Sequence, residues 1–210
     1  MNTLVITNGV IESTDDLVDL IEKHESIICA DGAVRYLRSV KRLPSHVIGD
    51  MDSINDDDLR WIEDHDVPII LFDTKKNYTD TELAVRYALE NGSRIITLTG
   101  TLGGRLDHSL GNVYLLVLMA EQGCDGIIVE TNTEVRLITK RVSLNWKIGE
   151  TVSFVPISKE VEEVTLTGFE YPLKKETLYL GHTRSISNMV ADFNQMVEVG
   201  SGMLLAIRNK

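Results

Sequence analysis

The stretch HVIGDMDS at residues 46–53 joins an apolar run to a turn that carries two aspartates. Five similar runs surround it, namely TLVIT (3–7), SIICA (26–30), VPIILF (67–72), RIITLT (94–99) and GIIVE (126–130). Several of these runs are apolar without alternation, which is typical of parallel strands covered by helices on both faces. Helical patterns lie between them, so residues 1–132 are predicted to form a parallel-sheet α/β domain.

Capping signals mark the ends of several predicted helices. Ser13 and Thr79 each precede an acidic residue by three positions, which is the spacing of a capping box. Asp107 opens the apolar pattern HSLGNVYLLVLMAEQ. Gly123 is predicted to end that helix, because glycine readily adopts the left-handed conformation found there.

The sequence changes character after about residue 132. Short β-rich runs separated by turn residues replace the helical patterns: EVRLIT (134–139), ETVSFVP (150–156), EEVTLTG (162–168), ETLYLG (176–181), NQMVEVG (194–200) and GMLLAIR (202–208). The segment Gly200-Ser201-Gly202 is predicted to be a hairpin loop between the last two. Residues 133–210 are therefore predicted to form a second domain, a small antiparallel β-sandwich.

Composition narrows the range of partners and compartments. The 210 residues carry 21 Lys and Arg against 32 Asp and Glu, a formal net charge of -11, which disfavours nucleic acid and anionic membrane. The N-terminus lacks the pattern of a signal peptide, and no apolar run approaches the roughly 20 residues of a membrane span. Cys29 and Cys124 form no CxxC motif, so we expect buried free thiols and a cytoplasmic protein.

Acidic residues follow the predicted strands at their carboxyl ends, where doubly wound folds bind ligands. Asp50 and Asp52 share a face if their turn is extended, so both carboxylates can reach one cation, and Asp80 can join them from the next loop. Mg²⁺ prefers a few carboxylate oxygens together with water and phosphate oxygens, so a Mg²⁺ site is predicted. The alternative is a turn in which Asp52 caps a helix that starts near residues 53–55.

The run GTLGGRLD at residues 100–107 has the features of a phosphate-binding loop. Gly103 and Gly104 lack a Cβ, so the backbone can approach a phosphate closely. The N-terminus of the following helix favours an anion, and Arg105 adds a planar fork suited to phosphate oxygens. The run is not a P-loop, because no Gly-Lys-Ser/Thr follows it. The alternative is a tight turn with Asp107 as the helix N-cap.

The second half contains one polar cluster, SISN at residues 185–188, which taken alone is an ordinary turn. The segment GFEYP at residues 168–172 places two aromatic residues beside a proline, and Phe169 is expected to have a packing role.

These motifs, in this order, resemble the thiamine pyrophosphokinase family. The matching stretches span most of the chain: ADGAVRYL (30–37), VIGDMDS (47–53), KNYTDTELA (76–84), LTGTLGGRLDH (98–108), TGFEYPL (167–173) and SISN (185–188). The resemblance implies an α/β domain, a C-terminal β-sandwich and a homodimer whose active sites lie at the subunit interface. It also implies that the β,γ-pyrophosphoryl group of ATP passes to thiamine with release of AMP.

The resemblance also implies roles for individual residues. Asp50, Asp52 and Asp80 are similar to the family's Mg²⁺-binding acids, and they form the catalytic set together with Arg105 and Asp107. The ATP-binding positions are Asp31, Gly32, Lys76, Thr79, Gly103, Gly104 and Arg105, and the thiamine-binding positions are Tyr171, Ser185, Ser187 and Asn188. The chain departs from the family pattern at Asn77, where an acid is common, and at Ala33, where glycine is frequent.

The chemistry of such a transfer suits these residues. A primary alcohol must attack a polyphosphate that repels nucleophiles, so catalysis consists mainly of positioning and charge neutralisation. Either Asp107 or a metal-linked aspartate can accept the hydroxyl proton, and the sequence does not choose between them.

Two other classes of protein use similar motifs. A Mg²⁺-dependent phosphatase with an Asp nucleophile usually has an apolar strand running directly into D-x-D-x-T, whereas here Gly49 precedes the motif and Ile54 fills its last position. A non-catalytic nucleotide-sensing or thiamine-binding module has no need of three acids at one edge of a sheet.

Overall fold

The structure is a computed structural model that describes residues 1–73 and 77–210. The chain forms two compact units, Met1–Thr131 and Asn132–Lys210. The described strands of the first unit are β1 (Asn2–Ile6), β2 (Ser26–Ala30), β3 (His46–Gly49), β4 (Ile69–Leu71), β5 (Ile95–Thr99) and β6 (Asp125–Val129). Its helices are α1 (Thr14–Glu22), the short 3₁₀ helix η1 (Asp31–Ala33), α2 (Val34–Ser39), α3 (Asp56–Asp64), α4 (Asp80–Glu90) and α5 (Leu106–Glu121).

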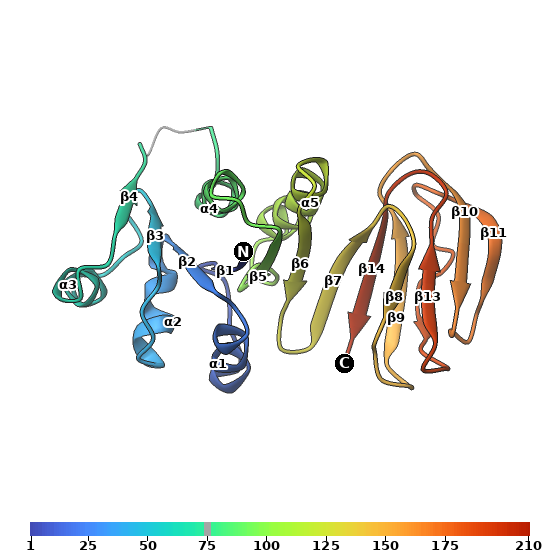
Figure 1. The fold of residues 1–210 in the computed structure, drawn as a ribbon, viewed down its shortest axis with the longest axis horizontal. Helices are drawn as coiled ribbons and strands as arrows, with labels where there is room; N and C mark the ends of the chain where they lie inside the picture. The colour runs from blue at the N-terminus through green and yellow to red at the C-terminus, as the bar shows by residue number, and fades with distance from the viewer. Residues whose placement is uncertain (74–76) are drawn as a thin grey trace. The chain divides into compact units, whose positions relative to one another are not determined.

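The strands of the first unit form a parallel sheet in the order β4-β3-β2-β1-β5-β6. Helices α4 and α5 lie on one face, and α1 and α2 lie on the other (Figure 1). Leu4 and Ile6 of β1 belong to the core on the side of α1 and α2, while Val5 between them is also fully buried. Successive residues of a strand point to opposite faces, so burial on both faces explains the absence of alternation.

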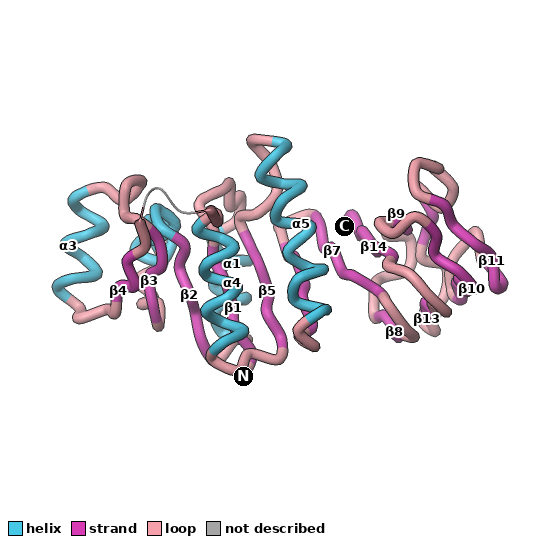
Figure 2. The backbone as a smooth tube through the Cα atoms, turned by 90° about the horizontal axis from the view of Figure 1, so that it is seen from above, coloured by secondary structure: helices cyan, strands magenta, loops and turns pink. Residues whose placement is uncertain are grey.

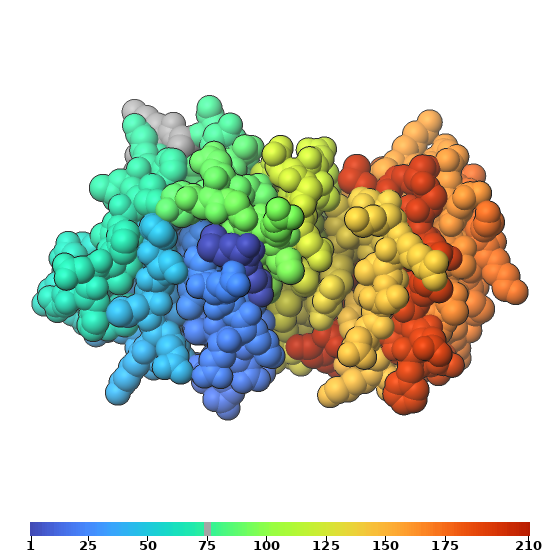
Figure 3. Space-filling view, viewed as in Figure 1, coloured from blue at the N-terminus to red at the C-terminus, as the bar shows by residue number. Residues whose placement is uncertain are grey.

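The amino ends of β1 and β5 mark the edge of the sheet opposite the candidate site. The N-terminal residues lie at the surface there (Figure 3), and the Arg94 N–H donates to the Met1 carbonyl oxygen at 3.0 Å.

Helix caps agree with the sequence at two positions and differ at two others. Ser13 and Thr79 cap α1 and α4 through their hydroxyls, as predicted. Helix α3 is capped by Asn55, so the alternative that assigned a capping role to Asp52 is wrong. Helix α5 starts at Leu106 and has Arg105 at its N-cap position, so Asp107 lies inside the first turn and is not the cap. Gly123 follows the end of α5 with φ +72°, as expected for a helix terminator.

The second unit contains strands and loops only among its described residues (Figure 2). Its strands are β7 (Thr133–Ile138), β8 (Val142–Leu144), β9 (Thr151–Pro156), β10 (Glu160–Thr167), β11 (Leu173–Tyr179), β12 (Asn188–Met189), β13 (Gln195–Glu198) and β14 (Leu204–Asn209). They form two antiparallel layers, β12-β9-β14-β7 and β11-β10-β13-β8. The rings of Phe154 and Phe169 pack edge to face in the core, with 5.0 Å between their centroids, which confirms the packing role of Phe169. The predicted fold class is therefore confirmed.

The predicted hairpin at residues 200–202 is wrong. Strand β13 pairs with β8 and β10, whereas β14 pairs with β7 and β9, so this segment carries the chain from one layer to the other. The Gly200 N–H donates to the Glu162 carbonyl oxygen at 2.9 Å, and a Cβ on Gly202 would lie 2.5 Å from the Glu160 carbonyl oxygen. Glycine is needed there because backbone passes backbone, a contact that local sequence does not reveal.

Cys29 and Cys124 are free and buried, as expected. In the described part of the chain, no helix combines the length and apolar character that a bilayer crossing requires.

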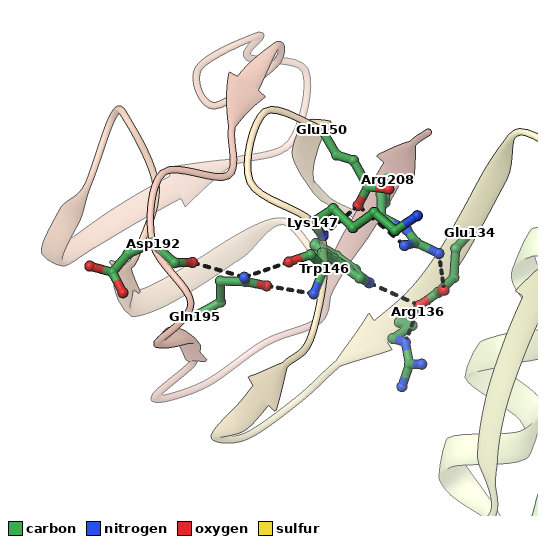
Figure 4. A network of polar contacts seen from close by, with 8 residues as sticks. All are labelled: Glu134, Arg136, Trp146, Lys147, Glu150, Asp192, Gln195 and Arg208. Atoms are coloured by element: carbon green, nitrogen blue, oxygen red, sulfur yellow. Dashed lines mark hydrogen bonds and ion pairs between the residues drawn. The ribbon is translucent and has the colours of Figure 1, made fainter.

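A buried ion-pair network ties together the layer that contains β7 and β14 (Figure 4). Glu134 accepts from Arg208 Nη2 at 2.6 Å, from Arg136 Nε at 2.5 Å and from Trp146 Nε1 at 3.1 Å. Arg208 Nη1 also donates to Glu150 at 3.2 Å. Burial by itself would raise the pKa of Glu134, but the two guanidinium groups and the indole hold that pKa below its ordinary value. Glu134 is therefore ionised at neutral pH.

Arg208→Met should destabilise the protein strongly, because it removes the cation shared by the buried Glu134 and the largely buried Glu150. We expect the free energy of unfolding in urea to fall by about 3–5 kcal/mol. Arg141→Met is the matched control, since Arg141 pairs with Glu198 at 3.3 Å on the exposed surface of the same unit. That change should cost at most about 1 kcal/mol. Equal losses of unfolding free energy in the two variants would contradict the assignment of Arg208 to a buried ion-pair network.

Candidate functional site

A cavity of about 460 Å³ opens at the carboxyl edge of the parallel sheet. Six of the predicted ATP-side and metal residues line it: Asp31, Thr79, Asp80, Gly103, Gly104 and Arg105. Four further predicted residues are not part of the lining: Gly32, Asp50, Asp52 and Asp107. Lys76 falls in 74–76, outside the described residues.

Three aspartates converge beside the cavity. Carboxylate oxygens of Asp31, Asp50 and Asp52 all lie within 4.8 Å of one another. Asp31 follows β2 and is buried, whereas Asp50 and Asp52 follow the neighbouring strand β3 and are more exposed. The sequence assigned Asp31 to the nucleotide and Asp80 to this group. In the structure the carboxylate of Asp31 also belongs to the group, and Asp80 lies next to it.

Gly49, the last residue of β3, makes this convergence possible. A Cβ built on Gly49 would lie 3.0 Å from Asp31 Cβ and 3.1 Å from Asp80 Oδ1. Distances of 3.0–3.4 Å are tighter than nine in ten real Cβ contacts, so the neighbouring atoms would have to move by a few tenths of an ångström. The missing side chain therefore leaves the space in which the carboxylates from β2 and from the start of α4 approach the turn after β3.

Asp31 is a buried acid whose hydrogen bonding is incomplete. Among the described residues no donor reaches its buried Oδ1 atom. Burial raises the pKa of Asp31, and the charges of Asp80 and Asp52 add to the rise, while hydrogen bonds from Ser53 and from the Gly32 backbone oppose it. A cation at this point would satisfy the oxygen and screen the repulsion between the acids.

Backbone strain gathers in the same turns. Asp31 has φ +46° and Met51, between the two aspartates of the D-x-D pair, has φ +65°. L-residues other than glycine seldom adopt this region, and strained residues cluster at functional sites.

The predicted phosphate loop leaves β5 and enters α5. Gly103 and Gly104 have φ +91° and +68°, and a Cβ built on either would meet no atom within 4 Å. The backbone at these glycines therefore faces open space, as required for a ligand to approach it closely.

Arg105 and Asp107 form a two-pronged pair at the mouth of this loop. Arg105 Nε donates to Oδ1 of Asp107 at 3.1 Å, and Nη2 donates to Oδ2 at 2.5 Å. Both side chains are well exposed. The guanidinium lowers the pKa of Asp107 to about 2, so Asp107 is ionised and is a weak proton acceptor while the pair is intact.

The predicted thiamine residues lie in the second unit and have different environments. Asn188 is buried, and its Oδ1 accepts from the Tyr171 N–H at 3.0 Å while its Nδ2 donates to the Tyr171 carbonyl at 2.8 Å. Asn188 thus fixes the backbone of Tyr171, whose ring is exposed. Ser185 and Ser187 have φ +72° and +58°, so the SISN turn is strained like the acidic turns.

Two charged residues have roles that the sequence does not predict: Arg35, which lines the cavity, and Glu130, which contacts lining residues. Arg35 donates to the Asn8 side chain and carbonyl, which holds the loop after β1 against the cavity. Glu130 follows β6 and accepts several hydrogen bonds from the start of the phosphate loop. A charged residue directly after an apolar strand was the available signal for Glu130. Arg35 lies on a helix and gives no comparable signal.

Comparison with known proteins agrees with this geometry. The family model described as "Thiamin pyrophosphokinase, catalytic domain" matches residues 17–128, and "Thiamin pyrophosphokinase, vitamin B1 binding domain" matches residues 137–204. The chain belongs to the thiamin pyrophosphokinase family. The converging aspartates fall within the catalytic-domain match, and Tyr171 and Asn188 fall within the vitamin B1 binding match.

Individual family members are similar over nearly their whole length. The thiamine pyrophosphokinase of Bacillus subtilis (strain 168) is 32% identical over 216 residues, which cover 98% of this chain and 97% of that protein. A crystal structure of thiamine pyrophosphokinase from Bacillus subtilis superposes with TM-score 0.89 at 27% identity, covering 100% of this chain and 99% of the other. One from Geobacillus thermodenitrificans gives TM-score 0.87 at 28% identity, covering 100% and 98%.

Gly49→Ala should lower turnover at least about tenfold while the fold is kept, because the added methyl strains the backbone at φ +156° and shifts the neighbouring Asp31 and Asp80 by a few tenths of an ångström, and misplacement of positioned groups costs rate steeply. Turnover is measured as AMP formed, and circular dichroism checks the fold. Gly111→Ala in α5 is the control, because its Cβ would meet no atom within 4 Å. Activity of Gly49→Ala equal to that of the control would show that the close approach is unimportant.

Proposed function

We propose that this chain transfers the β,γ-pyrophosphoryl group of ATP to the hydroxyethyl oxygen of thiamine, giving thiamine diphosphate and AMP. The observation that carries the proposal is the convergence of Asp31, Asp50 and Asp52 beside a cavity whose other wall is a glycine-rich loop. Acids and an anion-binding loop facing one space are the parts that a Mg²⁺-nucleotide requires. Membership of the thiamin pyrophosphokinase family supplies the acceptor.

Mg²⁺ fits the donor set. Asp31, Asp50 and Asp52 would hold it, with Asp80 close by, and the buried Asp31 Oδ1 atom, which has no hydrogen-bond partner among the described residues, offers a ligand position. When bound, the ion neutralises phosphate charge and so favours attack by a nucleophile.

The chain's own residues bind and orient the nucleotide in this proposal. The open backbone at Gly103 and Gly104 receives phosphate oxygens, and Arg105 exchanges its exposed contact with Asp107 for the phosphates. Thr79 caps α4 and lines the cavity, which fixes the helix that carries Asp80. Gly32 lies so close to the Ser53 carbonyl oxygen that a Cβ built on it would be only 2.7 Å from that oxygen. The absence of a side chain therefore allows η1 to pack against this part of the chain. Lys76 stays a predicted ATP contact.

The bond changes follow from this arrangement. The thiamine hydroxyl oxygen forms a bond to the β-phosphorus, and the bond from that phosphorus to the α,β-bridging oxygen breaks, so the bridging oxygen leaves with AMP. The hydroxyl proton must pass to a base. Because the pair with Arg105 makes Asp107 a weak acceptor, we place the proton on one of the aspartates beside the cavity.

The thiamine side rests on the second unit. Tyr171 offers an exposed ring on which the cationic vitamin can stack. Asn188 orients the Tyr171 residue through its hydrogen bonds to the Tyr171 backbone. Ser185 and Ser187 stay predicted contacts that the strained SISN turn would present. The excess of acidic residues in the chain also suits a cationic substrate.

A homodimer with shared sites is the proposed assembly, in the cytoplasm. Apolar side chains are exposed on both units, as is common where subunits meet: Leu106, Leu110 and Tyr114 along α5, and Tyr171, Ile186, Met189 and Phe193 in the second unit. Side chains at i, i+4 and i+8 form one stripe of a helix, so the three on α5 offer a continuous surface.

Product analysis tests the proposed reaction. Parent protein incubated with ATP, Mg²⁺ and thiamine should yield AMP and thiamine diphosphate in equal amounts by mass spectrometry. Asp50→Asn should reduce turnover at least about a hundredfold, because it removes a charge from the phosphate site without touching the core. Asp66→Asn is the control, since this exposed residue has φ +51°, a conformation that asparagine tolerates. Free phosphate in place of AMP would support a phosphatase, and binding without turnover would support a non-catalytic module.

Mixed dimers test the shared site. A chain carrying Asp50→Asn is refolded with a chain carrying Tyr171→Ala and Ser187→Gly, each inactive alone. If each site uses both chains, one site of a mixed dimer receives both defects and the other receives none, so random pairing restores roughly a quarter of the parental activity. No recovery, with mixed dimers verified by mass, would place each site within one subunit.

A further inference from the structure

Glu130 makes an unusual number of contacts with the phosphate loop. Its Oε1 atom accepts from the Thr101 N–H at 2.7 Å, from Thr101 Oγ1 at 2.9 Å and from the Leu102 N–H at 3.1 Å. Its Oε2 atom accepts from the Gly100 N–H at 3.0 Å and from Thr99 Oγ1 at 3.5 Å. Three successive backbone N–H groups therefore point at one carboxylate.

Such a run of amides is an anion-binding concavity, which here is filled by the chain's own side chain. A carboxylate suits it because both of its oxygens accept and neither carries a hydrogen. These hydrogen bonds stabilise the carboxylate of Glu130 in its ionised form. Because the backbone N–H groups of residues 100–102 donate to Glu130, they are not available to a bound ligand. Only the N–H groups after Leu102 in this loop can donate to phosphate.

The opposite side of the loop start is held as well. The Gly100 carbonyl accepts from the Gly9 N–H at 3.0 Å and from the Thr7 hydroxyl, and Asn112 Nδ2 donates to the Thr101 carbonyl at 2.9 Å. Beyond this clamped portion, Gly103 and Gly104 face open space. The loop is therefore rigid where it leaves the sheet and free of protein contact where it borders the cavity.

Joining β5 to β6 does not require these contacts. The two strands already pair through the parallel ladder, whose described register ends at Leu98 and Ile128. Glu130 lies beyond the ladder, and the hydrogen bonds described above join it to residues 99–102, where β5 leads into the loop. Its contacts therefore act on the loop more than on the sheet.

We propose that Glu130 is a positioning residue for ATP. Its carboxylate fixes residues 100–102, so that Gly103, Gly104 and Arg105 border the cavity in the geometry that receives phosphate oxygens. The inference rests on the proposed function of the cavity. Glu130 lies outside both ranges matched by the family models.

Glu130→Gln tests the role with little change of shape. Glutamine keeps one acceptor oxygen, but its NH₂ group must face donors, so at least one of the loop amides loses its partner. Loss of one part-buried hydrogen bond to a charged group corresponds to about a tenfold change in an equilibrium constant. KM for ATP and the Kd of a non-hydrolysable ATP analogue, measured without thiamine, should therefore both rise about tenfold. KM for thiamine should stay within about twofold, because the change acts on one substrate only.

Asp125→Asn is the matched control, because it removes one exposed carboxylate from the amino end of β6, the strand that Glu130 follows. It should leave both KM values unchanged. If Glu130→Gln does not fold, Thr101→Val decides the question, since it removes one hydroxyl donor to Glu130, and it should shift the analogue Kd in the same direction.

Several results would overturn the inference. Unchanged analogue binding in Glu130→Gln, or equal rises in both KM values, would reduce Glu130 to a structural residue, and an unfolded Glu130→Gln with Thr101→Val unaffected would do the same. Failure of the proposed function looks different, because the parent protein itself would then release no AMP.

Discussion

Mutual repulsion among carboxylates is the constraint around which this site is built. Asp31, Asp50 and Asp52 lie within 4.8 Å of one another, and Asp80 approaches the same turn. Like charges at such distances are unfavourable unless a cation or hydrogen bonds offset them. The rest of the protein must therefore hold them, and it does so with the rigid parallel strands β2 and β3 and with the capped start of α4.

The loops at this edge are held by charges of opposite sign. Glu130 binds the amides that follow β5, and Arg35 binds carbonyl and side-chain oxygens that follow β1. Each charged group is complementary to the backbone atoms that it meets, since carboxylates accept and guanidinium groups donate. The two loops also contact each other where the Gly9 N–H donates to the Gly100 carbonyl at 3.0 Å. The cavity thus has a preformed wall.

Strain and function coincide in both units. Asp31 and Met51 in the acidic turns, and Ser185 and Ser187 in the SISN turn, all have positive φ. Each such residue costs of the order of 1–3 kcal/mol, and the surrounding structure has to outweigh that cost. In the second unit, the two hydrogen bonds from the Asn188 side chain to the Tyr171 backbone supply part of the stabilisation that offsets this cost.

The sequence by itself determined the α/β unit, the β-rich unit, the capping of α1 and α4, and the D-x-D and glycine-rich turns, because these depend on side-chain periodicity and on contacts a few residues apart. Only the tertiary structure decided the partners of β14, the place of Asp31 among the acids and the contact of Glu130 with Gly100. Each of these joins segments far apart in the chain. Local sequence carries no record of such neighbours, since strand pairing and loop packing are selected by the fold as a whole.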